Sequence, residues 1–214
     1  MKVISAFSGI SYGNPGKRDW RRCVDNIERN IIKPFATDTY ITTYHNDYTD
    51  DLVLRYKPKK YNLLDYVGSD TRTTYKKTLE LLLDVDFDIA ITTRFDIRFN
   101  EDYNPSDYNI DYDKINLLFK EQDWWNNNRY TCDPQLFCIF PKKYIIEMIN
   151  TTQELYDYPH REGCMDLHPF YNYITKKIDS SNINFIFDEE SHSHDNKYYI
   201  LDRWSPWWPN FAGL

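Results

Sequence analysis

Short apolar runs and amphipathic stretches alternate along the chain. Residues 3–7 form a near-continuous apolar run that stops at Ser8 and Gly9, as expected for a strand buried on both faces. Trp20, Val24 and Ile27 recur at helical spacing, which predicts a helix over about 18–32, and Pro34 is expected to end it. The same pattern predicts further strands at 39–43, 52–56, 87–92, 115–119, 136–140, 183–187 and 198–201, and helices over about 70–83, 142–156 and 168–178.

This alternation indicates an α/β fold with a mostly parallel central sheet, helices on both faces and a single domain. Ligands of such sheets bind at the carboxyl ends of the strands. Residues 7–14, 44–47 and 94–96 each follow a predicted strand, so we expect them to form one rim. The segment 204–209 is unusually apolar, so it either packs back on this domain or leads into another.

Composition narrows the choice of partners. The net charge is −7 and Lys and Arg gather in no run beyond 57–60, so nucleic acid is not an expected partner. The four cysteines lack zinc-site spacing, and no apolar stretch approaches the length of about 18 residues that a membrane span requires. We therefore expect a cytoplasmic protein without a membrane span. Aromatic residues make up 17% of the chain and suit the flat faces of sugars and bases, although biased codon usage explains them equally well.

The segment that ends the strand over 87–92 is the most informative for chemistry. It delivers Arg94, Phe95 and Asp96 to the rim. A carboxylate there can hold a hard divalent cation together with phosphate oxygens and water. Arg94 can hold a phosphate or orient Asp96 through a bidentate pair. The alternative is a simple Arg94–Asp96 ion pair that only supports the strand end.

This segment resembles the variant Asp-x-Asp motif of GT-A-fold glycosyltransferases, in which the first acidic position reads Arg. Residues 71–79 are similar to the helix that leads into that motif, and residues 3–9 to the nucleotide-binding first strand. Residues 132–137 resemble the Asp-x-Gln stretch of the second half. The likeness covers about 1–205 and extends to the N-terminal glycosyltransferase domain of a chlorella-virus capsid-glycosylation protein. It implies a GT-A-like fold with a nucleotide-binding half over about 1–100 and an acceptor half over about 101–214.

The resemblance also implies an activity. We expect transfer of a hexose or deoxyhexose from a UDP-sugar donor to a glycan acceptor, in viral capsid glycosylation, with manganese (Mn²⁺) or magnesium (Mg²⁺) as cofactor. Asp96 is the expected metal ligand from this motif, and His194, or its neighbour His192, is the expected late ligand. Asp133 is the carboxylate expected to meet the acceptor or the donor sugar, as a base if the reaction inverts configuration. Asp133 is alternatively a turn residue before Pro134.

The other rim residues are candidates for binding different parts of the donor. The backbone of Phe7, Ser8 and Gly9 can approach the ribose and diphosphate, because glycine presents no side chain. The remaining donor-binding candidates are Arg18 for a phosphate, Tyr44 for stacking on uracil, Asp47 for the uracil N–H or the ribose, Arg72 for the diphosphate or Asp96, Phe95 within the motif, and Trp124 or its neighbour Trp125 for stacking on a sugar. Asp84, Asp86 and Asp88 precede their strand, so we expect them to be solvated turn acids.

Two other classes of function stay open. A GT-A fold without turnover would bind carbohydrate through Trp124 and the tyrosines, with no dependence on metal. A metal-dependent hydrolase or nuclease would use Asp96 with His192 and His194, but the acidic composition and the lack of a second clustered acid oppose it.

Overall fold

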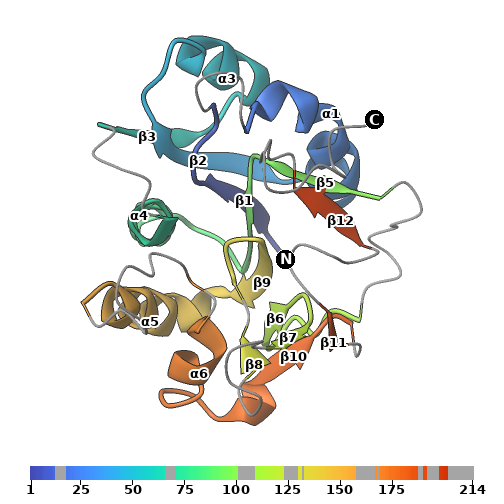
Figure 1. The fold of residues 1–214 in the computed structure, drawn as a ribbon, viewed down its shortest axis with the longest axis vertical. Helices are drawn as coiled ribbons and strands as arrows, with labels where there is room; N and C mark the ends of the chain where they lie inside the picture. Colours follow the sequence, from blue (N-terminus) through green and yellow to red (C-terminus); the bar gives the residue numbers. More distant parts are fainter. Residues whose placement is uncertain are drawn as a thin grey trace.

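A computed structural model describes residues 1–12, 18–65, 71–100, 109–122, 130–131, 133–157, 167, 169–187, 190–191 and 198–201 (Figure 1). Its strands are β1 (Val3–Ser8), β2 (Asp38–Tyr44), β3 (Lys60–Leu64), β4 (Ile89–Arg94), β5 (Ile97–Phe99), β6 (Ile115–Leu117), β7 (Lys120–Gln122), β8 (Tyr130–Thr131), β9 (Phe137–Pro141), β10 (Ile183–Phe185), β11 (Glu190–Ser191) and β12 (Tyr199–Leu201). Its helices are η1 (Trp20–Arg22), α1 (Val24–Ile27), η2 (Glu28–Ile32), α2 (Lys33–Phe35), α3 (Thr49–Tyr56), α4 (Thr71–Leu81), η4 (Lys142–Tyr144), α5 (Ile145–Asp157), α6 (Phe170–Ile174) and η5 (Ser180–Asn182). None of these described helices has the length and apolar character needed to cross a membrane.

The centre of the fold is a seven-stranded sheet in the order β10-β6-β9-β4-β1-β2-β3. β1 pairs in parallel with β2 on one side and β4 on the other, while β9 runs antiparallel to both β4 and β6. The sheet is therefore mostly parallel with one reversed strand, which confirms the predicted architecture. Two smaller sheets, β11-β7-β8 and β12-β5, lie outside it.

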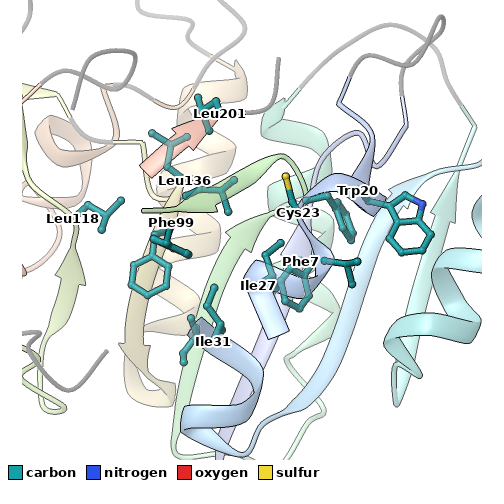
Figure 2. Packing of buried hydrophobic residues seen from close by; sticks show 14 of the residues in the cluster. Phe7, Trp20, Cys23, Ile27, Ile31, Phe99, Leu118, Leu136 and Leu201 are labelled. Carbon is teal, nitrogen blue, oxygen red and sulfur yellow. The ribbon is translucent and has the colours of Figure 1, made fainter. Parts of the chain in front are cut away.

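Helices cover both faces of this sheet, as predicted. In β1, Phe7 packs with residues of η1, α1, η2 and α3, whereas Ile4 and Ala6 pack with residues of α4, α5 and α6. Neighbouring side chains of a strand point to opposite faces, so this apolar strand contributes to both layers. Figure 2 shows the first cluster, where Phe7 and Ile27 lie between the sheet and the helical segment. Burial of each large apolar side chain stabilises the fold by roughly 1.5–3 kcal/mol.

Three predicted elements differ from the observed ones. Residues 52–56 belong to helix α3 rather than to a strand, because Leu52 and Tyr56 are buried one helical turn apart against the sheet. Pro34 does not end the first helical segment, because it lies in the first turn of α2, where its missing N–H is not needed. The segment ends instead at Ala36, whose φ of 48° is left-handed. The helix predicted over 168–178 is confined to α6.

Candidate functional site

Three neighbouring strands end at the same edge of the sheet. Ser8 pairs in register with Thr42 of β2 and with Arg94 of β4, so the carboxyl ends of β2, β1 and β4 lie side by side. The reversed strand β9 begins at this edge, since Phe137 pairs with Thr93 and the Thr93 hydroxyl donates to the Leu136 carbonyl at 2.7 Å. The rim predicted from the sequence is thus assembled, with the segment before β9 as a further component.

A buried ion pair marks the end of β4. Arg94 donates from Nε to Asp96 Oδ1 and from a terminal guanidinium nitrogen to Asp96 Oδ2, both at 2.7 Å. The side chains are 3% and 1% exposed, respectively. A second guanidinium approaches, with Arg18 Nε 4.0 Å from Asp96 Oδ2 and its side chain 25% exposed. Both oxygens of this carboxylate are therefore engaged by arginine.

In this arrangement a guanidinium already occupies the carboxylate that was expected to hold a divalent cation. A cation at Asp96 would have to displace a bidentate guanidinium and would lie close to two positive charges. Within the ranges that the structure describes, no three His, Cys, Asp or Glu side chains gather in a group that could hold a metal ion. His194 and His192, the other expected ligands, lie outside the described residues. The metal role of Asp96 remains a prediction from the sequence.

The ends of β1 and β2 are joined by a buried polar network. The Ser11 N–H donates to Thr43 Oγ1 at 3.2 Å, and the Thr43 hydroxyl donates to Ser11 Oγ at 2.9 Å. Asn46 donates from its side-chain nitrogen to Ser11 Oγ at 3.1 Å and accepts from the Tyr48 N–H at 2.9 Å. The loop after β1 and the turn after β2 are therefore held as one unit.

Two tyrosines and an arginine lie on this unit. The rings of Tyr12 and Tyr48 have centroids 4.5 Å apart, and the Arg21 guanidinium lies 4.2 Å from the centroid of the Tyr48 ring. Both tyrosines are partly exposed. Asp19 fixes Arg21 by accepting from its guanidinium, with the shortest contact at 2.7 Å, and from its backbone N–H. We call Tyr12, Tyr48 and Arg21 the tyrosine–arginine cluster.

The electrostatics of this cluster agree with its geometry. Burial acts to raise the pKa of Asp19, but the hydrogen bonds and charge of Arg21 outweigh it and lower that pKa below its ordinary value. The hydrogen bonds that Arg21 donates to Asp19 in turn raise the pKa of Arg21. The pKa of Tyr12 is raised by burial and by the neighbouring Tyr48. Arg21 therefore stays cationic beside the rings of Tyr12 and Tyr48, which favours cation–π contacts.

The cluster occupies the place expected for Tyr44. Tyr44 itself is 5% exposed, so its ring is buried in this structure, and the stacking role predicted for it remains a prediction. Tyr12 and Tyr48 were not among the predicted site residues. The signal that could have found them is their place, since each lies in the loop that follows a parallel strand on the same rim.

The other donor-binding candidates differ in how deeply they are buried. Phe7 and Phe95 are fully buried with ring centroids 5.7 Å apart, so only their backbone could face a ligand. Asp47 is exposed in the turn after β2, on the predicted rim. Trp124 and Trp125 lie outside the described residues.

Arg72 links two helices. Its guanidinium donates to the Leu155 carbonyl at 2.9 Å and lies 5.2 Å from the centroid of the Tyr156 ring. These contacts tie the beginning of α4 to the last turns of α5, and a positive charge near helix carbonyls at a C-terminus is favourable. The predicted contact of Arg72 with a diphosphate remains a prediction.

Asp133 adopts the turn geometry that was the alternative to a catalytic role. Its Oδ1 accepts from the Gln135 N–H at 2.9 Å, as in an Asx turn. Gln135 is fully buried and lies over Gly9, where an added Cβ would lie 3.4 Å from Gln135 Nε2. Gly9 has a φ of 106°, so the backbone after β1 takes a conformation that suits glycine. The turn lies next to β1 and β4, because Gln135 lies over Gly9 and the Pro134 carbonyl accepts from the Thr92 hydroxyl at 3.4 Å, and the catalytic role of Asp133 remains a prediction.

Two buried hydroxyls lie in the same row of the sheet. Ser8 and Thr42 are register partners, both are fully buried, and neither hydroxyl has a hydrogen-bond partner in the part of the chain that the structure describes. Asp86 and Asp88, by contrast, are exposed beside Lys2 at the opposite edge of the sheet. Their position confirms that these acids belong to a turn away from the rim.

Known structures share this fold. No protein-family model matches the chain, and no curated protein matches it in sequence. A nucleoside-diphosphate-sugar pyrophosphorylase from Vibrio cholerae RC9 is 14% identical with a TM-score of 0.55, covering 94% of this chain and 95% of the other. A glycosyltransferase involved in the glycosylation of the major capsid of PBCV-1 is 10% identical with a TM-score of 0.52, covering 87% and 81%. The 4-diphosphocytidyl-2C-methyl-D-erythritol synthase from Anaerococcus prevotii DSM 20548 is 14% identical with a TM-score of 0.50, covering 88% and 90%.

Proposed function

We propose that this chain, whose fold is shared with enzymes of nucleotide-sugar chemistry, is a glycosyltransferase that uses a nucleotide-diphospho-sugar. The observation that carries the proposal is the order of groups along the rim. The tyrosine–arginine cluster lies at the ends of β1 and β2, and Arg18 with Arg94 and Asp96 lies at the end of β4. An aromatic surface followed by guanidinium charge suits a base followed by a diphosphate.

The donor that we propose is a UDP-sugar carrying a hexose or deoxyhexose, and the proposed acceptor is a glycan. The support is the likeness of residues 94–96 and 132–137 to GT-A glycosyltransferases, together with the fold shared with the PBCV-1 capsid glycosyltransferase. Viral capsid glycosylation is proposed on the same grounds. Stacking on Tyr12 or Tyr48 would hold the uracil, and Asp47 could accept from the uracil N–H or the ribose.

The reaction exchanges one bond to the sugar for another. An acceptor oxygen forms a bond to C1 of the sugar, the bond from C1 to the phosphate oxygen breaks, and the nucleoside diphosphate leaves with the electron pair. The proton of the acceptor hydroxyl passes to a base, for which Asp133 is the candidate at the start of β9. Its turn would have to bring the carboxylate within about 3 Å of that hydroxyl.

Ligand binding tests this proposal directly. We expect UDP and UDP-sugars to raise the melting temperature more than the corresponding guanosine or cytidine compounds do. A ligand at 100 times its dissociation constant stabilises a protein by about 2.7 kcal/mol, which such a scan resolves readily. Release of UDP in the presence of a glycan acceptor would then establish transfer. A chain that binds oligosaccharides but no nucleotide would contradict the proposal and support the carbohydrate-binding alternative.

A second candidate is nucleotidyl transfer. It is favoured by the fold shared with the Vibrio pyrophosphorylase over 94% of this chain. The two reactions break different bonds, because nucleotidyl transfer attacks the α-phosphorus and releases pyrophosphate, whereas glycosyl transfer attacks C1 of the sugar. Incubation with UTP and a sugar 1-phosphate, with detection of pyrophosphate, separates them. Pyrophosphate release without any glycosyl transfer would replace the first candidate by the second.

A further inference from the structure

Among the described residues, Arg18, Arg94 and Asp96 bring two positive charges and one negative charge together at the end of β4. Asp96 accepts two hydrogen bonds from Arg94, and Arg18 approaches the same carboxylate at 4.0 Å. Two guanidiniums and one carboxylate leave a net charge of +1 among these three groups. An arriving anion would be attracted to this centre, whereas an arriving divalent cation would be repelled by both arginines.

The backbone before η1 determines where Arg18 points. Arg18 has a φ of 56°, a left-handed conformation that residues other than glycine rarely adopt. The next residue, Asp19, accepts from the Arg21 backbone N–H and begins η1. The same short segment thus directs Arg18 toward Asp96 and Arg21 toward Tyr48. It connects the two charged parts of the rim.

We propose that Arg18 neutralises the diphosphate of the donor, in the place where a divalent cation would act, so that donor binding is independent of metal. This inference rests on the proposed function. The Asp96 carboxylate lies 4.0 Å from Arg18 Nε and attracts its guanidinium, and Arg94, which is almost fully buried, is a positioning residue that holds Asp96. As the bond from C1 to phosphate breaks, negative charge grows on the leaving phosphate oxygen, and the arginine stabilises it through charge-assisted hydrogen bonds.

Arginine suits this role better than lysine would. Its guanidinium is planar and permanently charged, and it can donate two parallel hydrogen bonds to a phosphate. Its partial exposure leaves a path to a ligand on the rim, whereas Arg94 is enclosed. The predicted consequence is selective, because loss of Arg18 should weaken diphosphate binding without removing the stacking of the base.

Calorimetry with UDP, uridine and inorganic pyrophosphate tests the inference, each in EDTA and in millimolar Mn²⁺. We expect the UDP affinity of the natural chain to change by less than threefold between the two conditions. Arg18→Gln should lose at least tenfold in affinity for UDP and pyrophosphate in EDTA, while uridine binding stays unchanged. Arg18→Lys should recover part of the loss. Arg29→Gln removes one charge from an exposed position on η2 and serves as the matched control, with no expected change.

The outcomes separate this inference from the proposed function. If UDP binds at least tenfold more tightly with Mn²⁺ and Arg18→Gln has no effect, the proposed function stands and the metal-free site is overturned. If UDP binds in neither condition, both are overturned. A melting temperature for each variant shows whether it is folded. If Arg18→Gln is unfolded, the comparison of Arg18→Lys with Arg29→Gln decides, since loss of affinity only in Arg18→Lys supports the site.

Discussion

The Thr43 hydroxyl both accepts from the backbone N–H of Ser11 and donates to the Ser11 side chain. Both residues are buried, and they belong to segments 32 positions apart in the sequence. One side chain therefore fixes the loop after β1 against the end of β2. The tyrosine–arginine cluster lies on the segments that this contact joins.

We expect Thr43→Val to lower the free energy of unfolding by about 1–3 kcal/mol, because the buried Ser11 N–H would lose its acceptor. The substitution keeps the shape of the side chain, so the loss reports the hydrogen bonds rather than a cavity. Urea unfolding measures it. Thr175→Val at the C-cap of α6 is the control, since the Thr175 hydroxyl donates to the Tyr171 carbonyl four residues earlier rather than to a distant segment. Equal effects at both positions would contradict a special role for the Thr43–Ser11 contact.

Asp96→Asn should destabilise the protein by about 3 kcal/mol or more. It keeps the size of the side chain but leaves the Arg94 guanidinium buried without its opposite charge. The double substitution Arg94→Met with Asp96→Leu should be less destabilising, because neither charge of the fully buried pair remains and Arg18 is partly exposed to solvent. Chemical denaturation of the three chains measures this. An Asp96→Asn chain that melts at or above the natural temperature would show that the ion pair does not support the fold.

Tyr48→Ala should weaken UDP binding about tenfold or more, since stacking on a base contributes roughly 1–3 kcal/mol in single-strand binders. Tyr48→Phe keeps the ring and should bind normally. Titration calorimetry with UDP measures both variants. If the alanine and phenylalanine variants bind equally well, the base does not stack on this cluster.

The Asp19–Arg21 pair predicts a dependence of stability on acid. The folded-state pKa of Asp19 lies below the ordinary value of 3.8, so its contribution is complete above that value and is lost as the pH falls through the lowered pKa. Asp19→Asn should therefore be less stable than the natural chain at pH 6. The difference should shrink as the pH falls below about 4. Unfolding by urea at several pH values measures it, and a constant difference would contradict the role of the Asp19 charge.

Gly9→Ala should lower the free energy of unfolding by about 1–2 kcal/mol. The φ of 106° is strained for alanine, and the new Cβ would lie 3.4 Å from Gln135 Nε2. Gly9→Ala with Gln135→Ala relieves the contact but not the backbone strain. Comparison of their stabilities with that of Gln135→Ala alone separates the two causes. A stable Gly9→Ala would show that this turn relaxes easily.

The strands that form the centre of the sheet could be predicted because each carries a clear apolar run. The runs at 3–7 and 136–140 lie close to β1 and β9, since burial on both faces leaves little choice of pattern. The prediction of a strand at 52–56 is wrong, because a run of five residues fits a strand and one turn of a buried helix equally well. Only packing of Leu52 and Tyr56 on one face distinguishes the two.

The site was harder to predict than the fold. The rim and the Arg94–Asp96 segment could be located, because strand ends are visible in the sequence. The approach of Arg18 to Asp96 could not be predicted. It depends on the left-handed backbone of Arg18, which no sequence motif indicates. The place of Tyr48 on the rim depends on the turn after β2, in which its N–H donates to Asn46 Oδ1, and the sequence pattern does not specify that turn.

In the proposed reaction, the reversal of β9 would bring the donor and acceptor sides of the site from separate parts of the chain. Because β9 runs against its neighbours, the segment that leads into it reaches the same edge as the ends of β1, β2 and β4. The side chains around Asp133 thus arrive from a part of the chain that supplies none of the tyrosine–arginine cluster. If the proposed roles of Asp133 and of the tyrosine–arginine cluster hold, substitutions in this segment would alter the choice of acceptor and leave the nucleotide preference unchanged.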